Sequence, residues 1–245
     1  MIEIIVLCII ILFFFYKQSS SEFRINQLEW SQTDTLGSLL SEHVPIVIRS
    51  IPHANFWTQS DVQQRTCFAL PIFKEMGLTE WLSSSNPSSM CPWKDEQAEK
   101  LASVSGIHVW ATKWTNPLMI APYAFWKFPV YHCWAGSVGL RKLYAHWTCI
   151  FPVDGEIRIT IMPQSVHSYL PSAWEGCVPS ELTSKDTPFV ADLTYLDIIL
   201  RPGTCAFIPA HWFVSWKSDN TVPMVCTISY HSPISFGYAM IKNKI

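Results

Sequence analysis

Residues 196–217, LDIILRPGTCAFIPAHWFVSWK, decide the fold class because they contain two short apolar strands separated by a turn. Leu196, Ile198 and Leu200 recur at every second position, so they share one face of the first strand. Pro202-Gly203 supplies the fixed φ and the permissive residue of a turn. We therefore predict that the second strand, Cys205 to Ile208, folds back as a hairpin and ends in an aromatic corner, PAHWF.

The composition is that of a folded, aromatic-rich chain. Aromatic residues make up 14% of the 245 residues and charged residues 15%, which excludes a disordered acidic chain. A chain of this length has room for one large β domain. The formal net charge of -2, without any cluster of Lys and Arg, gives no electrostatic footprint for nucleic acid, so no nucleic-acid partner is expected.

The N-terminus carries an uncharged apolar run at residues 4–16, IIVLCIIILFFFY. A membrane span needs about 20 residues, so a signal-peptide core is an alternative. A secretory signal begins with positive charge, whereas the only early charge is Glu3, and the serine run at 19–21 is a poor cleavage site. We therefore expect residues 1–17 to form an uncleaved single-pass anchor that contacts the membrane through residues 4–16.

Two basic residues follow this run, and they bear on its orientation. Lys17 and Arg24 lie after the apolar segment, and only Glu3 lies before it. The positive-inside rule then indicates that the folded domain lies on the cytoplasmic side of the membrane.

Eight cysteines are scattered along the chain without a CxxC motif. They stand at Cys8, Cys67, Cys91, Cys133, Cys149, Cys177, Cys205 and Cys226. Several lie in predicted strands beside apolar residues, which favours buried, reduced thiols. In an extracellular domain the even number would instead permit disulfides.

Helical signals dominate the first part of the chain. Residues 18–42 predict a polar linker leading into a short helix, and residues 43–245 predict one domain. A compact strand is expected at 45–49, PIVIR, and a helix at 94–103.

From Ile107 onward the pattern changes to that of short strands. We expect a strand at 107–110, and a connection rich in proline and aromatic residues at 117–134. The clearest strand covers 156–161, where Ile157, Ile159 and Ile161 face one side and Arg158 the other. A helical front end, short strands and no βαβ alternation predict a mainly β fold, a jelly roll or barrel.

An ordered series of signals resembles the JmjC-type, cupin-like oxygenase family. The series contains the strand at 45–49, the Gly-Ser-x-Gly-Leu turn at 136–140, the turn at Gly155 and, as its most specific part, residues 200–212. The resemblance covers residues 43 to 230. It implies a double-stranded β-helix, which is the jelly roll of the cupins, preceded here by an N-terminal hydrophobic anchor helix.

The family's enzymes hold Fe(II) through a His-x-Asp/Glu pair just after the Gly-Leu turn and a distal His after the Trp of the corner. On this sequence the resemblance places the pair near Arg141 to Tyr144 and the distal ligand at Val214. Leu143 and Val214 carry no donor atom, and Arg141 does not give up its proton. The sequence therefore predicts a degenerate member without the iron-binding triad, for which no cofactor is expected.

Five residues are candidates for lining a binding pocket: Tyr144, His146, Arg158, His211 and Trp212. A relocated metal site built from His146, His211 and His231 is an alternative, although isolated histidines on aromatic β-structure are more often packing residues. Arg158 would hold a carboxylate of 2-oxoglutarate if it pointed inward, but it alternates opposite the isoleucine face, which favours exposure.

Two classes of function stay open. The favoured one is a membrane-tethered, cupin-like domain that serves as a non-catalytic binding or structural module. The alternative is a hydroxylase that depends on Fe(II) and 2-oxoglutarate and uses a rearranged site. No GxSxG, GxxxxGK[ST], GxGxxG or HExxH motif suggests another enzyme class.

Overall fold

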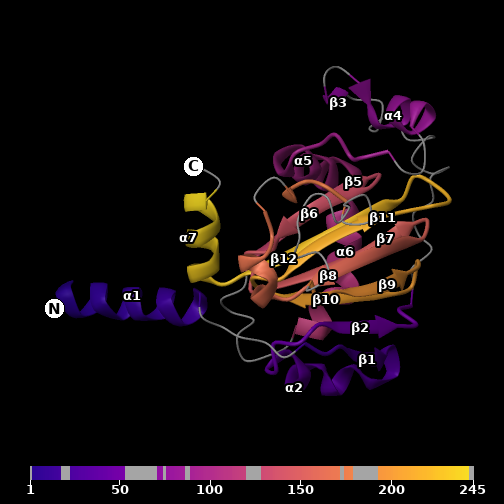
Figure 1. Ribbon diagram of the computed structural model, residues 1–245. Coiled ribbons are helices and arrows are strands. Elements are labelled where there is room, and N and C mark those ends of the chain that lie inside the picture. Colours follow the sequence, from indigo (N-terminus) through magenta and orange to yellow (C-terminus); the bar gives the residue numbers. More distant parts are fainter. Residues whose placement is uncertain are drawn as a thin grey trace.

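Two β-sheets, mostly antiparallel, form the centre of the molecule (Figure 1). The computed structural model describes residues 2–17, 23–52, 71–73, 76–85, 89–119, 128–171, 174–178 and 193–242. The larger sheet has six strands in the order β1-β2-β10-β7-β12-β5, and the smaller has four in the order β6-β11-β8-β9. The mainly β prediction is confirmed at this level.

The strands of the larger sheet are β1 Asn26–Glu29, β2 Ile46–Arg49, β5 Phe128–Ala135, β7 Trp147–Asp154, β10 Cys205–Pro209 and β12 Met224–His231. Those of the smaller sheet are β6 Val138–Lys142, β8 Ile157–Met162, β9 Leu196–Leu200 and β11 Phe213–Lys217. A separate pair is formed by β3 Pro71–Phe73 and β4 Met76–Gly77.

Helices cover the face of the larger sheet that points away from the smaller one. Their buried side chains share one core cluster with Ile46, Phe151, Phe207 and Ile228 of that sheet. The helices that contribute to this cluster are α2 Leu36–Leu40, α4 Leu78–Ser84, α5 Asp95–Ser105 and α6 Ile107–Thr115. Two further helices are α1 Ile2–Lys17 and α7 Pro233–Lys242. Short 3-10 helices are η1 Trp30–Thr35, η3 Asn116–Met119 and η5 Gln164–Ser168.

A second core cluster fills the space between the two sheets. The three isoleucines of β8, predicted to share a face, are fully buried in it, whereas Arg158 is exposed on the other face. Val214 and Trp216 of β11 join the isoleucines from the smaller sheet, and Ile150 and Ile208 face them from the larger sheet. Alternation along each strand thus builds a two-layer sandwich.

The two strands predicted at 196–208 form as β9 and β10, whereas the third strand, β11, was not predicted and the predicted hairpin is wrong. β9 pairs with β8 in the smaller sheet, whereas β10 lies between β2 and β7 in the larger one. The Pro202-Gly203 turn, with Gly203 at φ 92, therefore carries the chain from one sheet to the other. Leu200 and Ile208 belong to the same inter-sheet cluster, so the two strands bury their apolar faces toward each other across the sandwich.

Two further expectations, for residues 107–110 and 117–134, are wrong. Residues 107–110 start helix α6, because Ile107, Ala111 and Trp114 recur at helical spacing and are buried in the helix-side cluster. Residues 128–134, expected in a connection, belong to β5, which pairs with β12 along its whole length. The other aromatic residues of the expected connection, Tyr123, Phe125 and Trp126, lie outside the described residues.

The apolar run at the N-terminus forms helix α1, and its side chains from Ile5 to Leu7 and from Ile9 to Ile11 are exposed. Within the described part of the chain, no helix is both long enough and apolar enough to cross a membrane.

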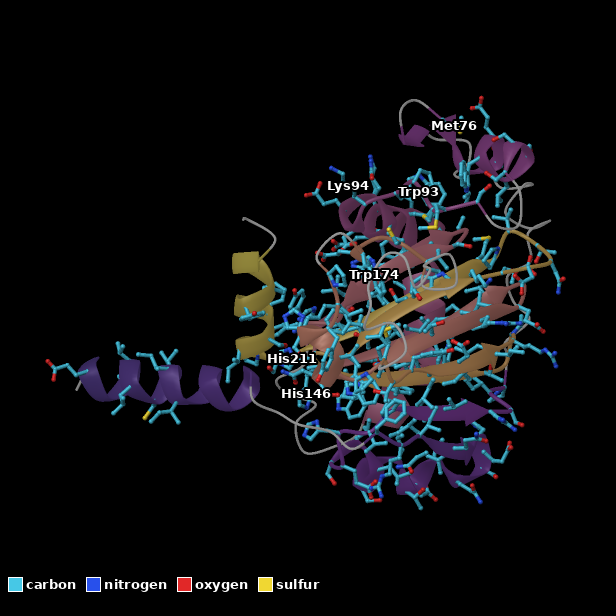
Figure 2. All side chains as sticks on the ribbon, in the orientation of Figure 1. Met76, Trp93, Lys94, His146, Trp174 and His211 are labelled. Atoms are coloured by element: carbon cyan, nitrogen blue, oxygen red, sulfur yellow. The ribbon has the colours of Figure 1, made fainter. Side chains whose placement is uncertain are left out.

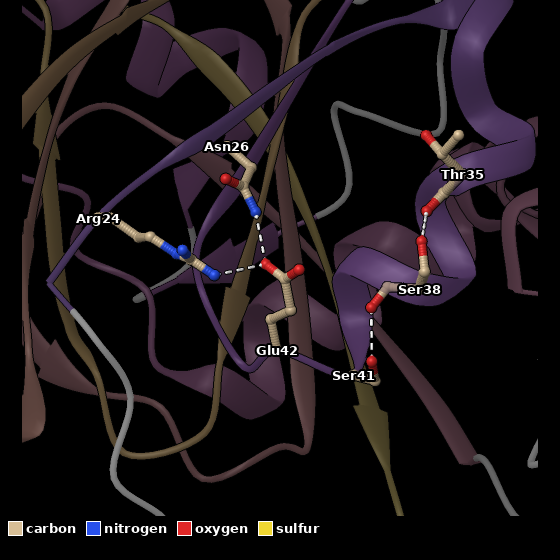
Figure 3. Close-up of polar contacts among 6 residues, drawn as sticks. All are labelled: Arg24, Asn26, Thr35, Ser38, Ser41 and Glu42. Carbon is tan, nitrogen blue, oxygen red and sulfur yellow. Dashed lines mark hydrogen bonds and ion pairs between the residues drawn. The ribbon is translucent and has the colours of Figure 1, made fainter.

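Polar contacts join the chain that follows α1 to the turn after α2 (Figure 3). Arg24 Nη2 and Asn26 Nδ2 both donate to Oε2 of Glu42, at 2.8 and 3.1 Å. β1 then pairs in parallel with β2, although residues 18–42 were expected to hold only a linker and a helix. The hydroxyl of Ser38 donates to the carbonyl of Thr35 at the end of η1, and the hydroxyl of Ser41 donates to the carbonyl of Ser38 in α2, which Figure 3 also shows.

Four of the thiols are buried in the helix-side cluster, as predicted: Cys133, Cys149, Cys205 and Cys226. Burial raises the pKa of Cys133 to about 12, so this thiol stays protonated and unreactive at neutral pH. The described cysteines are free thiols, and Cys67 lies outside the described residues.

Candidate functional site

Four polar side chains lie together on the inner face of the larger sheet, which is the face turned toward the smaller sheet. His132 of β5 stands opposite Thr227 of β12, and Thr148 of β7 stands opposite Ser229 of β12. Their neighbours along each strand pack in or against the helix-side cluster, so these four point the other way, into the sandwich. We call His132, Thr148, Thr227 and Ser229 the inner polar patch.

The hydroxyl groups of the patch are unequally satisfied. Trp134 Nε1 donates a hydrogen bond of 3.1 Å to the hydroxyl oxygen of Thr227. The hydroxyl of Thr148 is buried and has no hydrogen-bond partner among the described residues. Leaving such a group unpaired costs about 1–3 kcal/mol. The patch therefore contains a hydroxyl group, that of Thr148, without a hydrogen-bond partner among the described residues.

A charged pair adjoins the patch. Nη2 of Arg141 on β6 donates to both carboxylate oxygens of Asp95 on α5, at 2.9 and 2.7 Å. The guanidinium carbon lies 4.9 Å from the centre of the Trp134 ring, and the His132 ring stacks on the same indole at 5.8 Å. Trp134 therefore connects the charged pair to the patch.

His132 is neutral at pH 7. Burial lowers the pKa of His132 to about 4; Asp95 opposes this shift, whereas Arg141 and His231 add to it. A neutral imidazole has one donor and one acceptor nitrogen. The patch thus offers donors and acceptors without a net charge, while the nearby positive charge of Arg141 is balanced by Asp95.

The positions at which the family resemblance places metal ligands hold packed or paired side chains. Val214 and Leu143 are buried in the inter-sheet cluster. Arg141 is bound to Asp95, and the ammonium group of Lys142 lies 5.4 Å from the ring of Phe213, which packs in a cluster separate from the inter-sheet one. Two of these side chains lack donor atoms and two are cations, so they do not fit an iron ion. The remaining position, Tyr144, packs on Tyr238 of α7, and burial raises the pKa of its phenol, which disfavours the phenolate that a metal would need.

Four of the five predicted pocket residues come together at one end of the sandwich. The N–H of Leu143 donates to the carbonyl of Trp212, and the N–H of His211 donates back to the carbonyl of Leu143, at 2.9 and 2.7 Å. These bonds join the loop after β6 to the turn before β11, and Figure 2 shows His146 and His211 at this end. The four residues are Tyr144, His146, His211 and Trp212.

The side chains of these residues take different directions. Trp212 is fully buried between the sheets and stacks on Phe23 at 6.5 Å. Tyr144 contacts Tyr238 of α7, with 5.5 Å between ring centres. His146 meets His43 edge-on at 5.4 Å. The cluster therefore closes one end of the sandwich by aromatic packing.

Among the described residues, no group of three His, Cys, Asp or Glu side chains is placed to hold a metal ion. Of the histidines considered for a relocated site, His231 lies with its Nδ1 3.4 Å from the hydroxyl of Ser235. Arg158, the fifth predicted pocket residue, is exposed, and its Nη2 lies 3.7 Å from Oδ2 of Asp219. The structure therefore does not bring Arg158 to the other candidates.

Sequence reasoning missed the inner polar patch. His132 has no histidine or carboxylate at metal-ligand spacing in the sequence, and Asp95 is remote from it in the sequence. The available signal was the alternation of Val130, His132 and Trp134, which would have placed the three side chains on one face had residues 128–134 been predicted as a strand.

No protein-family model matches the chain, and no curated protein matches it. The functional conclusion therefore depends on the site itself.

Proposed function

We propose that this protein is a membrane-tethered, cupin-like jelly-roll module that binds a ligand or partner without catalysing a reaction. The strand connectivity supports the jelly roll: every step from β5 to β12, except that from β8 to β9, passes from one sheet to the other. Eight strands shared between two facing sheets are typical of cupins. The exposed apolar side chains of α1 support the tether.

One observation carries the non-catalytic proposal. The inward positions that would hold iron in the resembling enzymes are filled by Val214 and Leu143, which belong to the same core cluster as the isoleucines of β8. A metal centre at this place would require both side chains to be replaced and the core to be repacked.

The inner polar patch is the proposed binding determinant. Thr148 and Ser229 provide hydroxyl groups on neighbouring strands, and His132 is neutral at pH 7. Because the charge of Arg141 is already balanced by Asp95, these groups suit a neutral ligand with hydrogen-bonding groups better than an anion such as 2-oxoglutarate.

The alternative, a hydroxylase with a rearranged site, is tested on the full-length protein in detergent. Iron content is measured after incubation with Fe(II), and succinate release is measured with 2-oxoglutarate. We expect no stoichiometric iron, no succinate and no change in melting temperature with Fe(II). A variant with His146→Ala and His211→Ala serves as the control, and it should match the wild type in all three measurements.

Stoichiometric iron with succinate release, both lost in the double variant, would establish the hydroxylase and overturn the proposal. Iron binding without turnover would assign the module a metal and overturn the prediction that no cofactor is needed.

A further inference from the structure

A second apolar surface lies next to α1, on the C-terminal helix α7. Phe236 and Met240 are 39% and 49% exposed, and they stand four residues apart, so they share one face of the helix. Phe128, at the start of β5, is also exposed, and its ring lies 5.9 Å from that of Phe236. The three side chains form one apolar surface, which we call the α7 patch.

A cap at its first turn and packing on the sandwich fix the orientation of α7. The N–H groups of Ser232 and Ser235 each donate to the hydroxyl of the other residue, at 2.9 and 3.2 Å, which caps the first turn. Ser235 is fully buried, and Tyr238 packs on Tyr144. The helix is thereby held with one side toward the sandwich and the α7 patch toward the outside.

Helix α7 also contacts α1, and Figure 1 shows the two helices meeting beside the same end of the sandwich. The two sets of exposed apolar side chains therefore belong to neighbouring elements. A membrane that receives α1 lies next to α7 as well.

The charges of α7 and of the residues that follow it match an anionic membrane surface. Lys242 ends the helix, Lys244 follows it in the sequence, and residues 232–245 contain no Asp or Glu. A short helix with an apolar face and basic residues is typical of elements that lie in the membrane interface, where lysines near the surface are attracted to anionic lipids.

We propose that α7 is a second membrane contact, which lies in the interface of the bilayer that α1 enters and binds anionic phospholipid. This inference rests on the proposed tether. It orients the sandwich, because the end that carries Tyr144 and His211 then faces the membrane and the opposite end, near the Pro202-Gly203 turn, faces the solvent.

The test places an environment-sensitive fluorophore on the full-length protein bound to vesicles. The labelled variants carry Cys8→Ser, because Cys8 is exposed. The fluorescence from the remaining cysteines is measured on the Cys8→Ser protein alone and subtracted. One label is attached at Met240→Cys. The matched control is Ile199→Cys on β9, which is 50% exposed and precedes the turn at the far end. The vesicles contain phosphatidylcholine with or without phosphatidylserine, and some carry lipids with a nitroxide quencher.

We expect the label at residue 240 to shift to shorter wavelength and to be quenched by nitroxide lipids, more strongly with phosphatidylserine, while the label at residue 199 stays unquenched. Lys242→Glu should remove most of the dependence on phosphatidylserine. Equal behaviour of the two labels on protein that floats with the vesicles would overturn the α7 contact and leave the tether intact. If the full-length protein does not float with vesicles, the tether and the α7 contact both fail.

Discussion

The two faces of the larger sheet differ in what they bury. The helix-facing side holds thiols and large apolar side chains, among them Cys149, Phe151 and Phe207. The inner side holds apolar residues as well, but four of its positions form the inner polar patch. The helix-facing side also buries polar atoms without a partner among the described residues, such as the hydroxyl of Tyr230 on β12 and the indole N–H of Trp114, but these belong to large aromatic side chains that pack in the cluster. The inner side differs in gathering four small or neutral polar side chains at one place, and the proposed binding role depends on this grouping.

The largest expected effect concerns the apolar part of the inner face. Trp212 is fully buried between the sheets, and Trp212→Ala should lower the free energy of unfolding by about 3–5 kcal/mol, measured by urea denaturation. Phe207→Ala, on the helix-facing side, is the control and should cost a similar amount because this side chain is also fully buried. A melting temperature unchanged by Trp212→Ala would place the indole on the surface and contradict the two-layer packing.

A smaller effect is expected from pH. The folded-state pKa of His132, about 4, lies below the ordinary value of 6.5. The unfolded chain therefore binds more protons between these values, so this contribution to stability is complete above pH 6.5 and is lost as the pH falls toward 4. We expect a loss of about 1–3 kcal/mol, which allows for the partial exposure of the ring.

Urea denaturation at pH 7.5 and at pH 5 measures this loss, and His132→Gln provides the comparison. Because burial also lowers the pKa values of His43 and His231, the variant should retain part of the pH dependence. A variant with the same pH dependence as the wild type would show that His132 is not buried as a neutral ring.

Some strands were predicted from local patterns, but β1 and β5 were not, and the sheet to which each strand belongs was not predicted. The alternation at 157–161 identifies β8 because a strand's period is local. Residues 196–209 show why sheet membership could not be predicted from local patterns. A Pro-Gly turn is compatible both with a hairpin and with a connection that crosses from one sheet to the other. The choice between them depends on Ile48 and Cys149, which are the partners of β10 residues and are distant in sequence.

The site was predicted less well than the fold. Tyr144, His146, His211 and Trp212 were expected near a pocket, and the loops that carry them do meet. The inner polar patch escaped prediction because its members come from three strands, and only their pairing places His132 beside Thr227. Helix α7 was also missed, although Ser232-Pro233 is a usual start of a helix.

The smallest expected effect is the most informative about the patch. Thr148→Val replaces a hydroxyl that has no partner among the described residues by a methyl group of similar size. We expect a free energy of unfolding equal to that of the wild type or up to about 1 kcal/mol higher, because the unpaired group no longer has to be buried.

Thr227→Val is the matched control, since it lies on the same face and its hydroxyl accepts the hydrogen bond from Trp134. This change should cost about 1–3 kcal/mol, because the indole N–H is left unpaired. Urea denaturation of both variants gives the comparison. Equal costs would mean that Thr148 already has a partner within the fold, and the hydroxyl would then serve stability. Opposite signs would show that Thr148 is kept at the expense of stability, as a residue that binds a ligand is expected to be.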